Sequence, residues 1–228
     1  MRFLTLALIV LLSACSNEKK KMDPNHEFTF LALGDSYTIG EAVEESERWP
    51  VQLTRRLKED SINVTTRVIA TTGWTTDELQ KALVVEDLDK EYDLVSLLIG
   101  VNNQYRGYDE DQYEKEFKEL LHKAVELAGG NPYHVFVISI PDYGVTPFAA
   151  EKELDPEKIA HELDSYNAIA EKIATLSDVH FFNITPESRA AKTDSTLIAS
   201  DGLHPSGKMY EMWVDEVYKF VFDNLSSR

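Results

Sequence analysis

Apolar and β-branched residues gather in five short runs along the chain, and each run is followed by a loop that contains glycine or proline. The runs cover residues 28–33, 62–70, 92–99, 134–140 and 179–184. Runs of this length and composition are typical of strands. The run 92–99 is almost continuously apolar, which is the pattern of a parallel strand covered on both faces. The sequence therefore predicts five strands.

Between these runs, apolar positions recur at helical spacing. The segments 49–58, 109–127 and 155–176 follow this pattern, Thr76 marks a capped helix start, and the stretch beyond residue 206 reads as a terminal helix. Strands that alternate with helices form a parallel sheet, because right-handed crossovers place the helices on its faces. We therefore predict an α/β fold with a five-stranded parallel sheet. No repeat, linker or composition shift divides the chain after residue 25, so residues 26–228 are expected to form one domain.

The amino-terminal residues have the pattern of an export signal. Met1 and Arg2 precede an apolar stretch, residues 3–12, that is too short for an ordinary membrane span. Residues 12–15, Leu-Ser-Ala-Cys, resemble the lipobox of bacterial lipoproteins, in which the cysteine is lipidated. We therefore predict a signal peptide over residues 1–14 and lipidation of Cys15. The alternative is that Cys15 is a small residue near the cleavage site of a soluble protein.

Residues 15–25 are polar and aperiodic, which is typical of a tether between an anchor and a domain. These features predict a membrane-anchored lipoprotein of a bacterial cell envelope, held to the membrane by its acyl chains alone. Cys15 is the only cysteine, so an internal disulfide is excluded. The formal net charge of -17 repels phosphate groups, and no basic stripe is present, so no nucleic-acid partner is expected. The sequence leaves the oligomeric state open.

The residues Gly34-Asp35-Ser36 directly follow the first predicted strand. Ligands of open α/β sheets bind at the carboxyl ends of strands, so this position suits a serine nucleophile. The backbone N–H of Ser36 is also expected near a helix start, where negative charge is stabilised. The alternative is an ordinary turn, in which glycine supplies backbone freedom while aspartate and serine serve as caps.

A late loop supplies the partners that a serine nucleophile needs. A serine hydroxyl is a weak nucleophile unless a base takes its proton, and imidazole is the natural base at neutral pH. His204 fits this role, and Asp201, three residues earlier, is placed to orient its ring. We therefore expect Nε2 of His204 within hydrogen-bond reach of Ser36 Oγ, and Asp201 near Nδ1 of His204. Taken alone, His204 is equally compatible with a structural role in its loop.

Acyl transfer builds negative charge on the carbonyl oxygen, and donors must be placed where that charge appears. The backbone N–H groups of Ser36 and Gly73 and the side-chain amide of Asn102 are the candidate donors, because each follows a predicted strand. Each of these residues alone is also compatible with a structural role, Gly73 as a helix-entry glycine and Asn102 as a cap. Their joint occurrence with His204 at strand ends favours the catalytic interpretation.

These residues resemble the four sequence blocks of the SGNH hydrolase superfamily, the GDSL-type esterases and lipases. Gly34-Asp35-Ser36 is similar to the first block, Gly73 to the second, Gly100-Val101-Asn102-Asn103 to the third, and Asp201-Gly202-Leu203-His204-Pro205 to the last. Tyr37 and Asn103 stand where the family often has leucine and aspartate, at positions without a catalytic role. The resemblance implies a flavodoxin-like three-layer α/β/α sandwich. The Ser-x-Gly spacing of the α/β-hydrolase nucleophile elbow is absent.

The resemblance implies a serine ester hydrolase whose substrate is a small molecule, and it leaves the acyl and alcohol groups open. Small esters and acetylated carbohydrates are the favoured substrates, and lysophospholipids or acyl thioesters are the alternative. A non-catalytic envelope binding lipoprotein is a second alternative. Four aromatic residues lie near the predicted pocket and are candidates for an acyl or sugar site, or else core and rim residues: Trp74, Tyr105, Tyr143 and Phe148. No set of residues has metal-ligand spacing, and no cofactor is expected.

Overall fold

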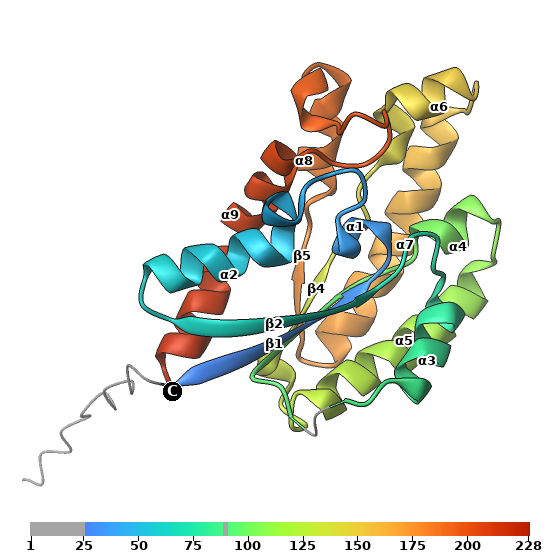
Figure 1. The fold of residues 1–228 in the computed structure, drawn as a ribbon. Coiled ribbons are helices and arrows are strands. Elements are labelled where there is room, and N and C mark those ends of the chain that lie inside the picture. Colours follow the sequence, from blue (N-terminus) through green and yellow to red (C-terminus); the bar gives the residue numbers. More distant parts are fainter. Residues whose placement is uncertain (1–25, 89–90) are drawn as a thin grey trace, which may run out of the picture.

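The computed structural model describes residues 26–88 and 91–228. Its five strands are β1 (Glu27–Gly34), β2 (Asn63–Ala70), β3 (Leu94–Leu98), β4 (Val135–Ile138) and β5 (His180–Phe182). All pair in parallel, in the order β2-β1-β3-β4-β5 (Figure 1). The predicted five-stranded parallel sheet is confirmed. The predicted signal peptide, Cys15 and the tether lie outside the described residues.

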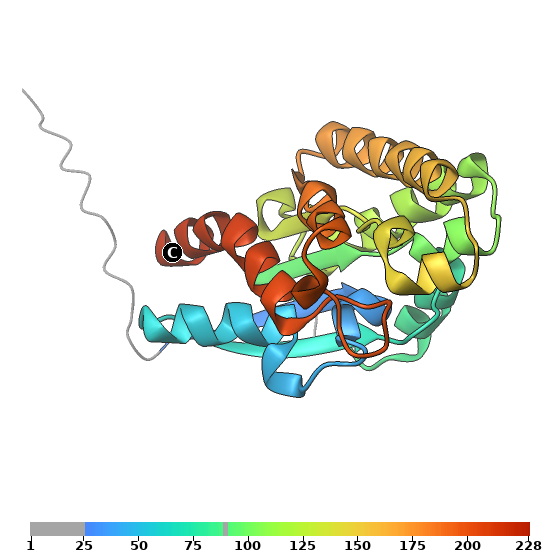
Figure 2. The same cartoon turned by 90° about the horizontal axis from the view of Figure 1, so that it is seen from above.

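Five longer helices cover the sheet: α2 (Trp49–Glu59), α3 (Thr76–Val85), α5 (Glu110–Leu127), α7 (Pro156–Leu176) and α9 (Gly207–Ser226). Helices α2 and α9 pack side by side on one face, and α3, α5 and α7 form a row on the other (Figures 1 and 2). The result is the expected three-layer α/β/α sandwich. None of the helices in the described ranges has both the length and the apolarity needed to cross a membrane.

Four short helices were not expected from the sequence: α1 (Ser36–Ile39), α4 (Val101–Tyr105), α6 (Pro147–Glu151) and α8 (Thr185–Arg189). Each spans four or five residues, which is too short for a helical period to show in the pattern of apolar positions. All four lie in loops that follow the carboxyl ends of strands. Three of them carry residues of the candidate site described below: α1 carries Ser36, α4 carries Asn102 and α6 carries Phe148.

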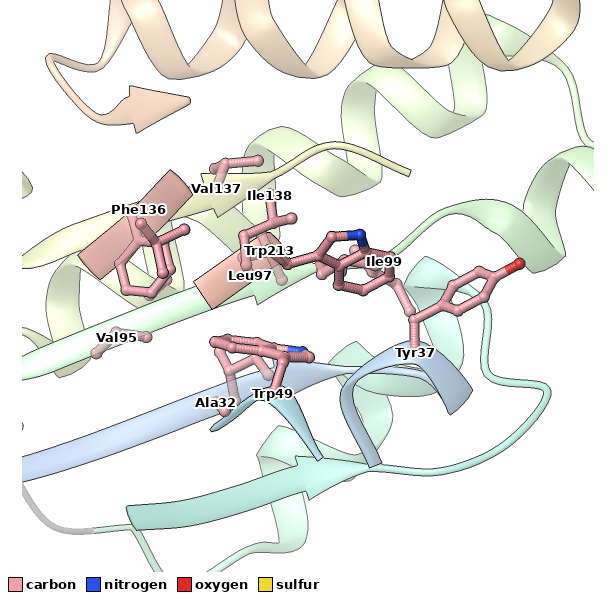
Figure 3. Close-up of a cluster of buried hydrophobic side chains, with 14 of the residues drawn as sticks. Ala32, Tyr37, Trp49, Val95, Leu97, Ile99, Phe136, Val137, Ile138 and Trp213 are labelled. Atoms are coloured by element: carbon pink, nitrogen blue, oxygen red, sulfur yellow. The ribbon is translucent and has the colours of Figure 1, made fainter. Parts of the chain in front are cut away.

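The core beneath the site is rich in aromatic side chains. Trp49 of α2, Phe136 of β4 and Trp213 of α9 are fully buried (Figure 3). The ring of Trp213 also makes an edge contact with Tyr37 of α1, with 6.4 Å between the ring centroids. Because buried aromatic side chains contribute large apolar areas, this contact fastens the short helix after β1 to the core of the domain.

The sheet register brings three loops together. Gly34, the last residue of β1, is paired with Ala70 of β2 on one side and with Leu98 of β3 on the other. The carboxyl ends of these strands therefore lie at the same edge of the sheet and at the same height. The loops that follow them begin next to one another, and they carry Ser36, Gly73 and Asn102.

Candidate active site

Ser36 is the first residue of α1, and the preceding strand and cap fix its position. Asp35 caps this helix, because its Oδ1 accepts a hydrogen bond from the backbone N–H of Tyr37 at 3.0 Å. Gly40, with a φ of 74°, ends the helix after a single turn. The serine side chain is only 5% exposed. The expected helix start at Ser36 is thus supplied by α1, and the longer α2 begins further along the chain.

Gly34 is required by close packing beneath Ser36. A Cβ atom at this position would lie 2.2 Å from Thr38 Oγ1 and 2.4 Å from the backbone oxygen of Leu98. Real Cβ atoms do not approach other atoms this closely, so a larger residue would push α1 away from the end of β3. The glycine of the Gly-Asp-Ser sequence therefore sets the distance between the serine and the neighbouring strand.

Asp35 is fully buried next to this serine. Its Oδ2 has no hydrogen-bond partner. Burial raises the pKa of Asp35 to about 7, although hydrogen bonds from the backbone, that of Tyr37 foremost, act to lower it. The carboxyl group is thus a cap for α1 that is held in an environment unfavourable to its charge.

The imidazole of His204 is oriented by a carboxylate from its own loop. Nδ1 of His204 lies 2.5 Å from Oδ2 of Asp201, and Oδ1 of Asp201 accepts the backbone N–H groups of Leu203 and His204 at 3.0 Å each. Burial acts to raise the pKa of Asp201, but the hydrogen bonds from His204 and from the backbone outweigh it and lower the pKa. The ionised carboxylate keeps Nδ1 engaged and leaves Nε2 of His204 as the free ring nitrogen.

A cavity of about 160 Å³ joins residues from the three strand ends and the late loop. It is lined by Ser36, Tyr37, Thr72, Gly73, Val101, Asn102, Tyr105, Tyr143, Phe148, Leu203 and His204. Ser36, Gly73, Asn102 and His204 thus share one cavity, with Asp201 behind the imidazole. Of the lining residues, sequence reasoning missed Tyr37, Thr72, Val101 and Leu203, all of which are direct neighbours of the motif residues.

No direct hydrogen bond joins the side chains of Ser36 and His204 in the described part of the chain, so the expected contact between Ser36 Oγ and Nε2 of His204 is not formed in this structure. Both residues nevertheless face the same small cavity. Catalytic hydrogen bonds of this type are often long in the absence of substrate and tighten in its complex.

The amide of Asn102 is held by the neighbouring loop. Its Nδ2 donates to the backbone oxygen of Trp74 at 2.9 Å. An amide nitrogen carries two hydrogens, so this bond fixes the side chain and leaves the second hydrogen free. Trp74 itself does not line the cavity, and of the two roles expected for it, pocket residue or core and rim residue, the structure has the second. Its indole packs against the hydrophobic core, and only its backbone carbonyl takes part in the site.

The other three aromatic candidates line the cavity together. The ring of Tyr105 makes an edge contact with Tyr143 and a tilted contact with Phe148, at centroid distances of 6.0 and 6.5 Å. Tyr143 also donates a hydrogen bond to Oε1 of Gln104 at 3.0 Å, whereas Tyr105 is 55% exposed. One wall of the cavity is therefore aromatic, and in it the ring of Tyr143 is fixed by a hydrogen bond while the ring of Tyr105 is exposed to solvent.

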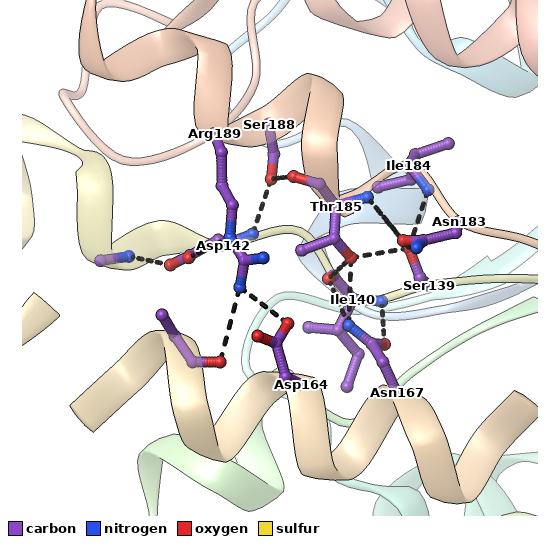
Figure 4. A network of polar contacts seen from close by, with 12 residues as sticks. Ser139, Ile140, Asp142, Asp164, Asn167, Asn183, Ile184, Thr185, Ser188 and Arg189 are labelled. Atoms are coloured by element: carbon purple, nitrogen blue, oxygen red, sulfur yellow. Dashed lines mark hydrogen bonds and ion pairs between the residues drawn. The ribbon is translucent and has the colours of Figure 1, made fainter. Parts of the chain in front are cut away.

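A buried polar network supports this wall from behind (Figure 4). Oδ2 of Asp142 accepts from Nε of Arg189 at 2.8 Å, and Oδ1 accepts the backbone N–H of Gly144, also at 2.8 Å. Deeper in the domain, Oγ of Ser139 and the side chain of Asn167 bond to the residues that follow β4 and β5. The loop that carries Tyr143 is thereby fixed on both sides.

Comparison with known proteins assigns the family. Residues 32–212 match the model of the GDSL-like lipase/acylhydrolase family. The chain belongs to this family. The resemblance noted in the sequence is confirmed, and with it the prediction that the protein is a carboxylic ester hydrolase.

Solved structures of other GDSL-like enzymes and esterases share the fold. A lipase/acylhydrolase from Enterococcus faecalis has a TM-score of 0.69 at 17% identity, with 86% of this chain and 96% of that chain covered. An acetylxylan esterase from Geobacillus stearothermophilus has a TM-score of 0.65 at 19% identity, with 85% and 94% covered. A psychrotrophic esterase from a Pseudoalteromonas species has a TM-score of 0.64 at 19% identity, with 85% and 96% covered. No curated protein matches the sequence.

Within the described ranges, no group of three or more histidine, cysteine, aspartate or glutamate side chains is placed to hold a metal ion.

Proposed function

We propose that this GDSL-like hydrolase cleaves small carboxylic esters through an acyl-enzyme formed on Ser36. The observation that carries the proposal is the shared cavity, in which Ser36, Gly73 and Asn102 face the imidazole that Asp201 orients. A nucleophile, a base and oxyanion donors around one small space are the minimal set for acyl transfer by serine.

In the first half of the reaction, Nε2 of His204 accepts the proton of Ser36 Oγ while the oxygen attacks the ester carbonyl. The tetrahedral intermediate then collapses, the bond to the alcohol oxygen breaks, and the imidazolium returns the proton to the leaving alcohol. In the second half, a water molecule loses its proton to Nε2 and attacks the acyl-enzyme. The bond from the acyl carbon to Ser36 Oγ then breaks, the imidazolium returns its proton to Oγ, and the acid is released. Asp201 stabilises the imidazolium in both halves.

The negative charge of each intermediate falls on the former carbonyl oxygen. The backbone N–H groups of Ser36 and Gly73 and the second hydrogen of Asn102 Nδ2 are the donors assigned to it. The amide of Asn102 is already fixed by its bond to the Trp74 carbonyl, so little reorganisation accompanies the reaction. Because Ser36 is the first residue of α1, its backbone N–H lies at the end of the helix where negative charge is stabilised.

The size of the cavity supports a short acyl group. Its volume of about 160 Å³ lies below the roughly 300–1,000 Å³ of sites that enclose drug-sized ligands. A long fatty-acyl chain would extend beyond it, which disfavours the lysophospholipase and thioesterase alternatives. The exposed ring of Tyr105 at the rim offers an apolar face to the alcohol part of the ester, and a sugar ring presents a matching flat surface. One structural neighbour is an acetylxylan esterase, which supports acetylated carbohydrates as substrates.

The proposed site of action is the envelope of a bacterium. The basic start, the apolar stretch 3–12 and the lipobox-like residues before Cys15 support export and lipidation. Radiolabelled palmitate should be incorporated into the full chain when it is expressed in bacteria, and Cys15→Ser should abolish the label. Labelling that persists in Cys15→Ser would contradict the anchor.

The reaction and the chain length are tested together with p-nitrophenyl esters from acetate to palmitate, using residues 26–228 and the variant Ser36→Ala. We expect the highest kcat/KM for acetate, a steep fall beyond butyrate, and loss of turnover in the variant. A preference for long chains would favour the lipase-like alternative. Equal turnover by Ser36→Ala would refute the acyl-enzyme. If no ester in the series is cleaved, a fluorophosphonate probe that labels Ser36 distinguishes an unsuitable alcohol group from a protein without a reactive serine.

A further inference from the structure

Arg106 connects two loops of the cavity. It directly follows α4, the helix that carries Asn102, and its guanidinium reaches back to the loop after β2. Nη2 donates to the backbone oxygen of Gly73 at 2.6 Å, and Nη1 lies 3.3 Å from the carboxylate of Glu78. Glu78 in turn accepts the backbone N–H of Thr75 at 2.9 Å. The arginine is therefore fixed by a carboxylate from the first turn of α3, the helix that follows the loop of Gly73.

The backbone at Gly73 needs such a restraint. Its φ is 90°, and a Cβ built there would meet one atom within 4 Å, Nη2 of Arg106 at 3.8 Å. Glycine is therefore required for the dihedral angle rather than for packing, and the turn that contains it is closed by one backbone hydrogen bond, from Trp74 N–H to the Thr71 oxygen at 3.2 Å. In the described part of the chain, Arg106 is the one hydrogen-bond donor to the Gly73 carbonyl.

Asn103 of α4 also bonds to the segment after β2, but at the start of α3 rather than at Gly73. Asn103 is completely buried; its Oδ1 accepts the backbone N–H of Thr76 at 3.0 Å and its Nδ2 donates to Thr76 Oγ1 at 2.6 Å. These bonds hold the start of α3 to α4, three residues beyond Gly73. Arg106 acts on Gly73 itself, with its side chain 41% exposed beside the cavity. Asn103 thus secures the start of α3. The peptide that carries the Gly73 carbonyl is held at its N–H, which Trp74 donates to the Thr71 oxygen at 3.2 Å, and at its oxygen by Arg106.

We propose that Arg106 is a positioning residue that sets the orientation of Gly73 and thereby aims its backbone N–H at the oxyanion. The expected effect of Arg106 on turnover rests on the proposed function. Holding the carbonyl of Gly73 restricts rotation about the only two soft dihedrals of that residue. A donor that is turned away from the developing charge stabilises the transition state much less, because oxyanion stabilisation depends on donors that are in place before the reaction starts.

The chain contains a matched control for this arginine. Arg67 of β2 has a side chain that is 36% exposed, bonds through Nη1 to the backbone oxygen of Asp87 at 2.6 Å, and pairs through Nη2 with Glu86 at 2.8 Å. Like Arg106, it bonds one backbone carbonyl and one glutamate, and its Nη1 also reaches the Tyr92 hydroxyl at 3.5 Å. Arg67 does not line the cavity. Arg67→Gln therefore reproduces the loss of such a pair without touching the proposed oxyanion donors.

The first measurement is steady-state kinetics with p-nitrophenyl acetate for Arg106→Gln, Arg106→Lys and Arg67→Gln. We expect Arg106→Gln to lower kcat about tenfold, less than the roughly hundred- to thousandfold cost of removing a donor, with KM changed less than about twofold. Lysine should restore part of the loss, because it supplies a charged donor without the bidentate reach of arginine. Arg67→Gln should keep the wild-type kcat. Equal kcat for Arg106→Gln and Arg67→Gln would overturn the proposal.

The second measurement does not depend on turnover. The chain has 10 glycines, so selective ¹⁵N-glycine labelling gives few backbone resonances. In Arg106→Gln the Gly73 amide resonance should shift or broaden, and in Arg67→Gln it should stay in place. An unchanged Gly73 resonance in Arg106→Gln refutes the positioning role even if no ester is cleaved. A shifted resonance together with an inactive wild-type protein would instead refute the proposed function and leave the positioning role standing.

Discussion

Two adjoining regions at the carboxyl edge of the sheet differ in how far their buried polar side-chain atoms are hydrogen-bonded, and in the described loops beyond β4 and β5 only Oε2 of Glu187 lacks a partner. Beyond β4 and β5, both polar atoms of the Asn167 side chain are bonded, and Ser139 Oγ makes several hydrogen bonds. Beyond β1, by contrast, Asp35 Oδ2 and Thr38 Oγ1 have no partner. Beyond β3, Asn102 uses one of its two amide hydrogens within the protein.

The contrast separates the region that supports the fold from the region to which we assign the reaction. A buried polar atom without a partner costs about 1–3 kcal/mol, so it is disfavoured unless another property of the site requires it. Saturated networks fix a unique arrangement, which suits the loop behind Tyr143. Of the groups in the other region, Asn102 lines the cavity, and its second amide hydrogen is a donor of the kind that a substrate carbonyl needs. The region beyond β4 and β5 should therefore govern stability, and the region beyond β1 and β3 should govern turnover.

The strongest test of this division is His204→Ala. Because the imidazole is the assigned base for both halves of the reaction, we expect kcat for p-nitrophenyl acetate to fall by about 10⁴-fold or more, while the midpoint of urea unfolding changes little. His122→Ala, at an exposed position of α5, is the control and should keep its activity. A loss of less than about tenfold would remove the histidine from the mechanism.

Asn102→Ala should have the next largest effect. Loss of one oxyanion donor typically lowers kcat by about a hundred- to a thousandfold, because the donor acts on charge that develops in the transition state. KM should change little. The expected readout is a split between kcat and KM in steady-state kinetics, and an equal change in both parameters would assign Asn102 to substrate binding instead.

Asp142→Ala tests the saturated region. The variant leaves the backbone N–H of Gly144 without its partner and removes one of the two carboxylates that bond Arg189. We expect the free energy of unfolding to fall by about 2–3 kcal/mol, since Arg189 is partly exposed and keeps Asp164. Urea unfolding measures this, and kcat of the folded fraction should stay within about threefold of wild type. A large loss of kcat at unchanged stability would contradict the assignment of stability to this region and of turnover to the region beyond β1 and β3.

The smallest effect, about 1.4 kcal/mol between pH 5 and pH 6, concerns the titration of Asp35. The pKa of Asp35 is raised from 3.8 to about 7, so between about pH 4 and pH 7 the folded protein holds a proton that the unfolded chain has released. This group therefore stabilises the fold fully below that window, and its contribution is lost as pH rises, by about 1.4 kcal/mol per unit. Asp35→Asn keeps the acceptor for Tyr37 and should flatten the profile of unfolding free energy between pH 5 and pH 6. An identical slope in both proteins would contradict the raised pKa.

The sequence allowed much of this arrangement to be predicted, because parallel strands deliver their following residues to one edge. Ser36, Gly73 and Asn102 each follow an apolar run, and the register of Gly34 with Ala70 and Leu98 makes them neighbours. The Asp201 to His204 spacing allowed both residues to lie on one loop. These inferences needed only local patterns and the geometry of a parallel sheet.

Other features depend on contacts between distant residues and left no local signal. The bond from Arg106 to Gly73 and the pair of Asp142 with Arg189 join segments far apart in the chain. Which of the four aromatic residues would line the cavity and which would pack on the core was left open by the sequence. Tyr105, Tyr143 and Phe148 line the cavity, and Trp74 packs against the core.

The direction of β1 has a practical consequence for handling the enzyme. The strand begins at Glu27 and ends two residues before Ser36, and its eight residues span about 26 Å at roughly 3.3 Å each. Coupling the protein to a bead or sensor chip through residues before His26 thus fixes it by the edge of the sheet opposite to the cavity. Immobilised in this orientation, the enzyme keeps its cavity mouth open to polymeric esters too large to diffuse beneath it.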